Sequence, residues 1–308
     1  ASAGSADAAA HSPDVAVICG PTAAGKSAIA MSLAQRSDIE IISADSRQVY
    51  RGFDVGTNKP TAADRQRVPH WAIDVADPGT RYSAAAWVTL ARAAITAACD
   101  HNRTPVVVGG TGFYINALFR PLWEEPPLDP AAREAVQREL ASWSTGELRR
   151  WCESLDPARA RRGRAQLLRA VEIALLTGER LSDLHRTRAR PGTLTPRYLV
   201  VDPGPALAAR IAARATAMVE AGWVDEVRRL MDSVPGSAPA WNATGYRTMR
   251  QHAMGEIGAT AAIERSVIET RQYAKRQRTW FRHQLEQDRT DHLAPETPGW
   301  EGWVNRWI

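Results

Sequence analysis

Short apolar runs alternate with longer amphipathic segments over the first 120 residues. The runs read DVAVIC, IEIISA and TPVVVGG and are almost continuously apolar. Strands of this kind are buried on both faces, and helices between them indicate a parallel, doubly wound α/β sheet. We expect strands at 14–19, 39–44 and 104–110 and helices at 25–36, 82–102 and 111–119.

The pattern changes at Pro121. The stretch PLWEEPPLDP is rich in proline, and residues 130–190 have the pattern of short Arg-rich helices without strands. RYLVVDPG (197–204) predicts a strand that returns to the sheet, and long helices follow near 205–232 and 260–285. We therefore predict an α/β core that is interrupted by a helical insertion. The predicted parts are a disordered tail at 1–13, a core at 14–120 and 196–285, the insertion at 121–195 and a C-terminal tail at 286–308.

The composition is that of a globular protein. The chain has 308 residues, 44% of them hydrophobic and 24% charged, and no apolar run approaches the roughly 20 residues that cross a bilayer. Its three cysteines (Cys19, Cys99 and Cys152) form no C-x-x-C pair, which argues against disulfides and structural zinc and favours a reducing compartment. We expect a cytoplasmic monomer without a membrane segment.

The positive charge is distributed unevenly. Residues 159–190 carry nine arginines against three acidic residues, and residues 265–282 carry six Lys/Arg against one Glu. A solvated helix face usually mixes the two signs, whereas such lopsided runs suit a polyanion. An Arg-rich composition is also what a GC-rich genome produces, so charge alone leaves nucleic-acid binding open.

A phosphate-binding motif, GPTAAGKS, directly follows the first predicted strand. Backbone N–H groups of such a loop, together with the positive end of the next helix, surround an anion. Only three lysines stand against 36 arginines in this chain, so a Lys within the motif indicates a need for a compact ammonium group. A serine hydroxyl at its end suits Mg²⁺. The predicted diphosphate-binding residues are Gly20, Pro21, Thr22, Ala23, Ala24, Gly25, Lys26 and Ser27, with Ser27 also the predicted metal ligand.

The residues after the other strands narrow the choice of phosphate ligand. A typical P-loop NTPase has a later strand that ends in a magnesium-binding Asp, but the strand at 104–110 ends in Gly-Gly-Thr. Asp45 follows the second strand and would face the same crevice as the phosphates, where a carboxylate can act as a base. Propensity alone also allows Asp45 to be a turn or helix-cap residue. A nucleoside or small-molecule kinase and a non-catalytic RNA-binding protein remain alternatives.

Seven motifs in fixed order resemble those of the tRNA dimethylallyltransferase (isopentenyl-diphosphate:tRNA transferase) family. They are GPTAAGKS (20–27), DSRQVYRGFDVGTNKP (45–60), PHWAIDV (69–75), VGGTGFYINAL (108–118), RAVEIALLTG (169–178), GYR (245–247) and TRQYAKRQRTWFR (270–282). The resemblance implies a P-loop NTPase-like core with a helical insertion. It also implies an enzyme that transfers the prenyl group of dimethylallyl diphosphate to N6 of the adenosine 3′ of the anticodon.

The resemblance assigns roles residue by residue. It implies that Asp45 is the general base, that Thr111 lies near the reacting centre, and that Lys26 and Arg247 steady the leaving diphosphate, with Mg²⁺ at Ser27. The implied tRNA contacts, which would hold the anticodon stem-loop, are Asp45, Ser46, Arg47, Gln48, Gln166, Leu167, Leu168, Arg169, Lys275 and Arg278. The chain departs from the family where ARARRGRAQLLR replaces a His-Pro-Asn-Asp stretch, and its Trp-rich end PGWEGWVNRWI matches no family motif.

Overall fold

The structure, a computed structural model, describes residues 14–120, 127–187 and 193–308. The expected disordered tail at 1–13 lies outside the described residues. The chain divides into two compact units, one formed by residues 1–119 with 193–308 and the other by 120–192.

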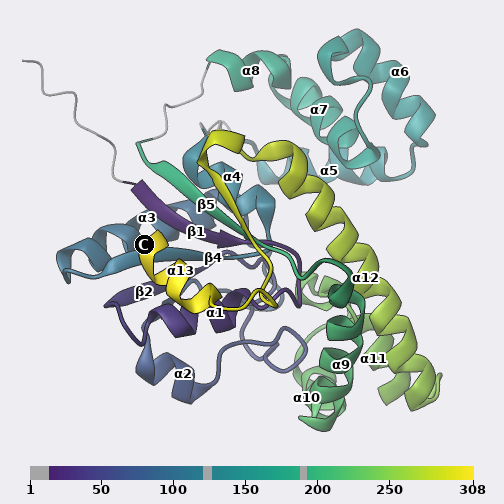
Figure 1. Cartoon of the computed structure of the whole chain (residues 1–308). Helices are drawn as coiled ribbons and strands as arrows, with labels where there is room; N and C mark the ends of the chain where they lie inside the picture. Colours follow the sequence, from purple (N-terminus) through teal and green to yellow (C-terminus); the bar gives the residue numbers. More distant parts are fainter. Residues whose placement is uncertain (1–13, 121–126, 188–192) are drawn as a thin grey trace, which may run out of the picture. The chain divides into compact units, whose positions relative to one another are not determined.

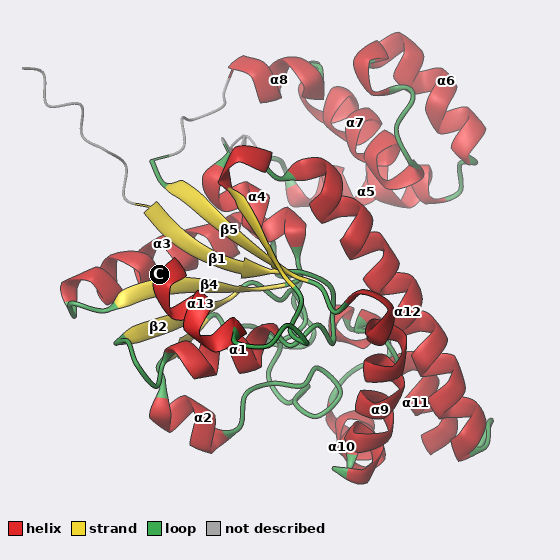
Figure 2. Ribbon diagram, viewed as in Figure 1, coloured by secondary structure: helices red, strands yellow, loops and turns green. Residues whose placement is uncertain are grey.

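The larger unit is built on a six-stranded parallel sheet (Figures 1 and 2). Its strands follow the order β3-β2-β4-β1-β5-β6. The strands are β1 (Asp14–Cys19), β2 (Ile39–Ser43), β3 (His70–Trp71), β4 (Thr104–Gly109), β5 (Thr195–Val201) and β6 (Thr290–Leu293). The four strands expected from the sequence are confirmed, and they form the middle of the sheet. The α/β fold class is therefore confirmed.

Helices cover both faces of this sheet. In Figure 2, α1 and α13 lie in front of the strands and α3 lies behind them. The helices are α1 (Lys26–Leu33), α2 (Ala62–Arg67), α3 (Ala84–Asp100), α4 (Gly112–Phe119), α9 (Leu207–Glu220), α10 (Trp223–Ser233), α11 (Tyr246–Ala253), α12 (Ala259–Gln284) and α13 (Trp300–Trp307), with 3-10 turns η2 (Gly204–Ala206), η3 (Pro239–Asn242) and η4 (Gln287–Arg289). The helix expected near 205–232 is two helices, α9 and α10, because the chain breaks at Ala221 and Gly222.

Side chains from alternate strand positions form the core on each face. Ile18, Ile41, Val106 and Leu199 belong to one cluster with the apolar side of α1. On the opposite side, the Trp87 indole of α3 donates to Ser43 O at 2.8 Å and stacks on the Tyr114 ring of α4, with 5.1 Å between ring centroids. Helices thus cover both faces of the sheet, and the carboxyl ends of its strands are the place where a ligand can bind.

The expected C-terminal tail at 286–308 is wrong, because most of this segment belongs to the core. Thr290–Leu293 is the edge strand β6, and Val304 and Trp307 of α13 are buried in the cluster around α1. The Trp307 indole donates to Asp291 Oδ2 at 2.7 Å, and the backbone carbonyl of Trp307 accepts from Arg197 Nη1 at 2.6 Å. A four-residue polar edge strand and a two-turn helix carry too little periodicity to be recognised in the sequence.

The smaller unit is helical, as its Arg-rich sequence suggests. It contains α5 (Pro130–Ala141), α6 (Thr145–Leu155), η1 (Pro157–Arg159), α7 (Arg164–Thr177) and α8 (Leu181–Thr187). Leu148, Leu167 and Val171 are fully buried in its own core. No strand occurs among the described residues of this unit, and the predicted boundary at 195 falls one residue inside β5.

Candidate active site at the phosphate loop

The phosphate loop links β1 to α1 at the carboxyl edge of the sheet. Gly20 has a φ of 139°, and a Cβ there would lie 2.2 Å from the Val201 carbonyl oxygen, so only glycine fits. Ala23 has a φ of 63°, and α1 begins at Lys26 after the left-handed Gly25. All eight predicted loop residues therefore lie in one tight curl at a helix N-terminus, as an anion site requires.

Two cations and one carboxylate interact at this loop. Lys26 Nζ donates to Pro21 O at 2.7 Å, and burial lowers the pKa of Lys26 to about 8. The charge of Asp45 opposes this decrease, whereas the charge of Arg214 adds to it. Arg214 Nη2 donates to Thr22 Oγ1 at 2.7 Å, and burial also lowers the pKa of its guanidinium. The site therefore holds more positive charge than its burial favours, an arrangement that an incoming anion stabilises.

Helix α9 supplies this second cation, which the sequence analysis missed. Arg210 and Arg214 are one turn apart on α9 and both reach the loop, since Arg210 Nη1 donates to Ala24 O at 2.9 Å. Ile211 lies between them and packs with Ala23. In an Arg-rich chain, no sequence signal separates these two arginines from the others on long helices.

Asp45 and Thr111 come together from the ends of two adjacent strands, β2 and β4. Asp45 Oδ1 accepts from Arg47 N at 2.8 Å, and Thr111 Oγ1 accepts from Ser46 N at 3.0 Å. Asp45 is half-buried and lines the cavity described below. It therefore closes a turn, as propensity allows, and also faces the site.

Gln277 ties the phosphate loop to the Gly-Gly-Thr block. Its Oε1 accepts from Thr22 N at 2.8 Å, and its Nε2 donates to Gly110 O at 2.8 Å. Its side chain is 6% exposed, and a Cβ at Gly110 would lie 2.3 Å from Nε2. A side chain at position 110 would therefore displace the Gln277 amide and disturb both of its hydrogen bonds. No local pattern in the sequence distinguishes Gln277, although it lies within a motif of the family resemblance.

Tyr273 lies one turn before Gln277 on α12 and interacts with Asp45 and Thr111. Burial raises the pKa of Tyr273 to about 12, and the charge of Asp45 acts in the same direction. A hydrogen bond with the Thr111 side chain acts against this increase. Tyr273, Thr111 and Asp45 are thus close enough to influence one another.

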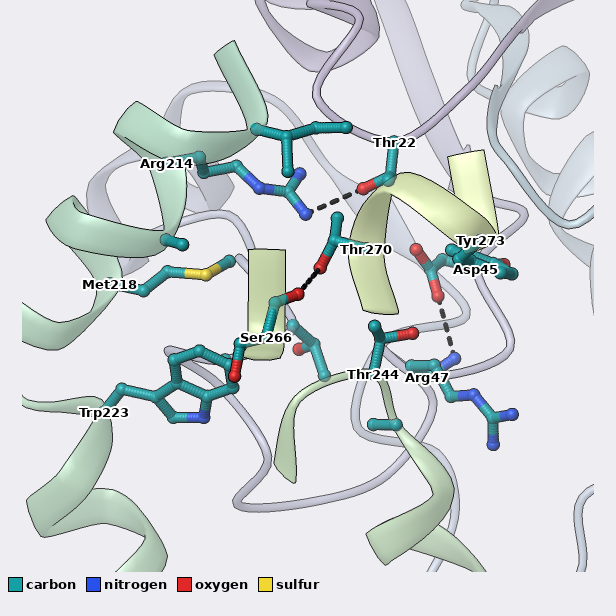
Figure 3. Close-up of a pocket in the computed structure, with 15 residues that line it drawn as sticks. Thr22, Asp45, Arg47, Arg214, Met218, Trp223, Thr244, Ser266, Thr270 and Tyr273 are labelled. Carbon is teal, nitrogen blue, oxygen red and sulfur yellow. Dashed lines mark hydrogen bonds between the residues drawn. The ribbon is translucent and has the colours of Figure 1, made fainter. Parts of the chain in front are cut away.

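Thr22, Asp45, Arg214 and Tyr273 border one cavity, which is partly open to solvent (Figure 3). Thr22 and Arg214 lie on one side of the cavity, Asp45 and Tyr273 on another, and Met218 with its apolar neighbours on a third. Its other labelled lining residues are Arg47, Trp223, Thr244, Ser266 and Thr270. The cavity therefore offers an anion subsite, a carboxylate and an apolar wall within reach of one ligand.

Two buried charged residues hold the loop that carries Asp45. Lys59 Nζ donates to Tyr50 O at 2.6 Å, to Asp54 Oδ1 at 2.6 Å and to Asp74 Oδ1 at 2.5 Å. Glu226 of α10 accepts from the backbone N–H groups of residues 54 and 55 at 2.9 and 2.6 Å. The loop wall is thus fixed from two sides before any ligand binds.

Some of the predicted catalytic and tRNA-binding residues do not line this cavity. Arg247 is exposed on α11, donates to Asn242 and is not among the described residues that line the cavity. The Gln48 amide bonds within its own loop, to Ser43, Thr57 and Asn58. Arg278 forms an ion pair with Asp202, whereas Lys275 is exposed.

The predicted tRNA contacts of the smaller unit also differ in exposure. Gln166 is exposed and Leu168 and Arg169 are half-buried, but Leu167 is fully buried. Its side chain is part of the helical core, so it has no surface to offer RNA. The prediction for the other three stays a prediction.

The loop also fits the predicted magnesium ion. The Ser27 side chain is exposed at the start of α1 and makes no hydrogen bond within the described part of the chain. No group of three His, Cys, Asp or Glu side chains that could hold a metal occurs among the described residues. Mg²⁺ commonly uses few protein ligands besides phosphate oxygens and waters, so one free hydroxyl beside a bound diphosphate is an adequate donor set.

Over the described residues, no helix is both long and apolar enough to span a membrane.

Comparison with known proteins agrees with this geometry. The IPP transferase family matches residues 48–284, and the isopentenyl transferase family matches residues 13–73. A tRNA dimethylallyltransferase of Halorhodospira halophila is 42% identical over 281 residues, which cover 88% of this chain and 91% of that protein. The tRNA dimethylallyltransferase of Thermus thermophilus is 39% identical over 274 residues, covering 88% and 90%.

Solved structures that resemble this chain are also tRNA prenyltransferases. The tRNA isopentenylpyrophosphate transferase of Bacillus halodurans has a TM-score of 0.68 at 32% identity and covers 96% of this chain and 95% of its own. A eukaryotic dimethylallyltransferase acting on tRNA has a TM-score of 0.79 at 26% identity, covering 94% and 76%.

Proposed function

The chain belongs to the IPP transferase family of tRNA dimethylallyltransferases, and we propose that it transfers a dimethylallyl group to N6 of the adenosine 3′ of the tRNA anticodon. The donor is dimethylallyl diphosphate, and diphosphate is released. The observation that carries this proposal is that Thr22 of the phosphate loop, Arg214 and Asp45 border one cavity. The kinase alternative is not favoured, because the relatives are prenyltransferases that act on tRNA.

Asp45 is the general base of this reaction. The lone pair of an exocyclic adenine amine is delocalised into the ring, which makes the nitrogen a poor nucleophile. A carboxylate that accepts the N6 proton while the carbon–nitrogen bond forms offsets this weakness. The bond from Asp45 Oδ1 to Arg47 N occupies one carboxylate oxygen and orients the other, which can receive the proton.

The leaving diphosphate is stabilised by the phosphate loop and two cations. Its negative charge grows as the carbon–oxygen bond breaks, so fixed positive groups lower the barrier. Backbone N–H groups of the loop, Lys26 and Arg214 are in position to do this. We assign to Arg214 the role that the family resemblance implies for Arg247, since Arg214 donates to Thr22 of the loop whereas Arg247 is exposed and donates to Asn242.

Thr111 and Tyr273 orient the reactants. The Thr111 hydroxyl holds the backbone of Ser46, next to the base, and Tyr273 interacts with both Thr111 and Asp45. The raised pKa of Tyr273 keeps its phenol neutral and able to donate a hydrogen bond. Mg²⁺ held by Ser27 would neutralise part of the diphosphate charge.

The target adenosine must leave its stack to reach this cavity, and basic surfaces hold the surrounding tRNA. We place these contacts on Ser46 and Arg47, on the exposed Lys275, and on Gln166 and Arg169 of the helical unit. The buried thiols Cys19 and Cys152 are free, which supports a cytoplasmic enzyme, and we propose that it acts as a monomer.

The test is incubation of the purified chain with an unmodified anticodon stem-loop and either labelled dimethylallyl diphosphate or labelled ATP. We expect label from the prenyl donor on the adenosine 3′ of the anticodon, and none from ATP. A matched RNA with guanosine at that position is the control. Transfer from ATP, or no transfer from the prenyl donor, would overturn the proposal.

A further inference from the structure

Helix α4 carries an exposed aromatic residue beside the reacting centre. Phe113 is 63% exposed, more than any other large apolar side chain among the described residues. Its neighbours Gly112, Tyr114 and Ile115 are all buried. Exposed apolar residues are common on protein surfaces, but this one stands two residues after Thr111. Its position in the first turn of α4, at the carboxyl end of β4, therefore calls for an explanation.

A second aromatic side chain lies next to it. Helices α4 and α12 pack together, and Trp280 of α12 lies over Gly112, where a Cβ would come within 2.2 Å of the indole ring. Trp280 is half-buried, so part of its ring remains on the surface. Phe113 and Trp280, the rim aromatics, thus lie close to Thr111 in the chain fold, since Phe113 is in the first turn of α4 and Trp280 covers Gly112.

One exposed cation lies on the same face of α12 as Trp280. Arg276 is exposed one turn before Trp280, and its guanidinium lies 5.8 Å from the centre of the Tyr273 ring. Aromatic faces beside an exposed cation match an RNA strand, since the cation meets a phosphate and the rings meet unpaired bases.

We propose that Phe113 stacks on an unpaired base of the anticodon loop next to the target adenosine. The inference rests on the proposed function, because an adenosine that leaves its stack to reach Asp45 exposes the face of a neighbouring base. Phe113 offers an apolar ring in place of the lost stacking partner. Since a phenyl ring reads no base edge, this contact adds affinity for an unstacked loop without selecting a sequence.

The first experiment measures kcat/KM for the stem-loop with Phe113→Ala and Phe113→Trp. Base–aromatic stacking predicts a loss of about 5- to 150-fold for Ala, with the KM of the prenyl donor unchanged and activity restored by Trp. Met254→Ala, at a 47% exposed apolar residue after α11, is the matched control and is expected to match the wild type. A Phe113→Ala loss below twofold, with the Tm unchanged, would overturn the proposal.

A double-mutant cycle identifies the stacked base. Stem-loops with an abasic site on either side of the target are assayed with the wild type and with Phe113→Ala. We expect one abasic site to lower the wild-type kcat/KM and to cost the variant nothing further. Additive losses at both positions would overturn the inference. Because the wild type on the intact stem-loop tests prenyl transfer itself, failure of the function is distinguished from failure of the stacking contact.

Discussion

Gln277→Leu is the most informative single substitution in the core of the site. Leucine has a similar size and leaves no room for water, but it removes the acceptor of Thr22 N and the donor to Gly110 O. Gly110 is fully enclosed and Thr22 is half-buried, so the carbonyl loses its partner completely and the amide in part. With about 1–3 kcal/mol for each unsatisfied buried group, the expected destabilisation is about 2–4 kcal/mol.

Thermal unfolding measures this loss directly. A protein of this size shifts its Tm by about 2–3 °C per kcal/mol, so Gln277→Leu is expected to unfold roughly 4–12 °C below the wild type. Gln272→Leu, at an exposed glutamine on the same helix, is the control. A Gln277→Leu shift no larger than that of the control would refute the idea that this amide ties the two loops together.

Gln277→Glu separates hydrogen bonding from packing. The carboxylate still accepts from Thr22 N but faces the Gly110 oxygen without a proton to donate, so the protein is expected to lose stability at neutral pH. Contact with that oxygen raises the folded pKa of the new carboxyl group above its unfolded value. Stability is therefore recovered below the unfolded pKa and lost as pH rises through the folded pKa. Equal pH profiles for the Glu and Leu variants would contradict this account.

The remaining predictions concern charge. Asp45→Asn should lower turnover roughly 10²–10⁴-fold while the stem-loop still binds, and unchanged single-turnover rates would remove Asp45 from the mechanism. Because only the ammonium form neutralises diphosphate, donor affinity should fall as pH rises through the Lys26 pKa of about 8; equal Kd values at pH 7 and pH 9 would contradict this. Lys59→Met removes the buried ammonium that Tyr50 O, Asp54 and Asp74 share and should cost about 1–3 kcal/mol in a denaturant titration, whereas a loss below about 0.5 kcal/mol would show that the cluster is not stabilising. Replacing both Arg161 and Arg162 with Ala should reduce the slope of log K for tRNA binding against log salt concentration by about 0.7–0.9 for each lost phosphate contact. An unchanged slope would place the contacts elsewhere.

The middle of the sheet could be predicted from the sequence, but its edges could not. Strands β1 and β4 are covered on both faces, so they read as unbroken apolar runs. Strand β3 has two residues and β6 has four, with a polar composition that matches loops equally well. Their pairing depends on neighbours that are distant in the chain, and no local pattern records it.

The candidate site divides in the same way. The phosphate loop is a local motif, and Asp45 and Thr111 follow strands whose ends meet at one edge, so strand order alone brought them together. Arg214, Tyr273 and Gln277 lie on long helices, where periodicity shows that a face is buried but not what it contacts. The reason for glycine at position 110 is the Gln277 amide packed against it, and this contact is known only from the structure.

The position of β1 in the sheet has a consequence for how the protein is made. β1 pairs with β4 on one side and, through Asp14 and Thr195, with β5 on the other, so its second neighbour is synthesised only after the whole helical unit. Until then the nascent chain presents an apolar strand with one open edge, which is a template for aggregation. Parallel pairing across so long a separation is also slow. We therefore expect the yield of folded enzyme in cells to depend on folding rate and on chaperones more than on the stability of the finished protein.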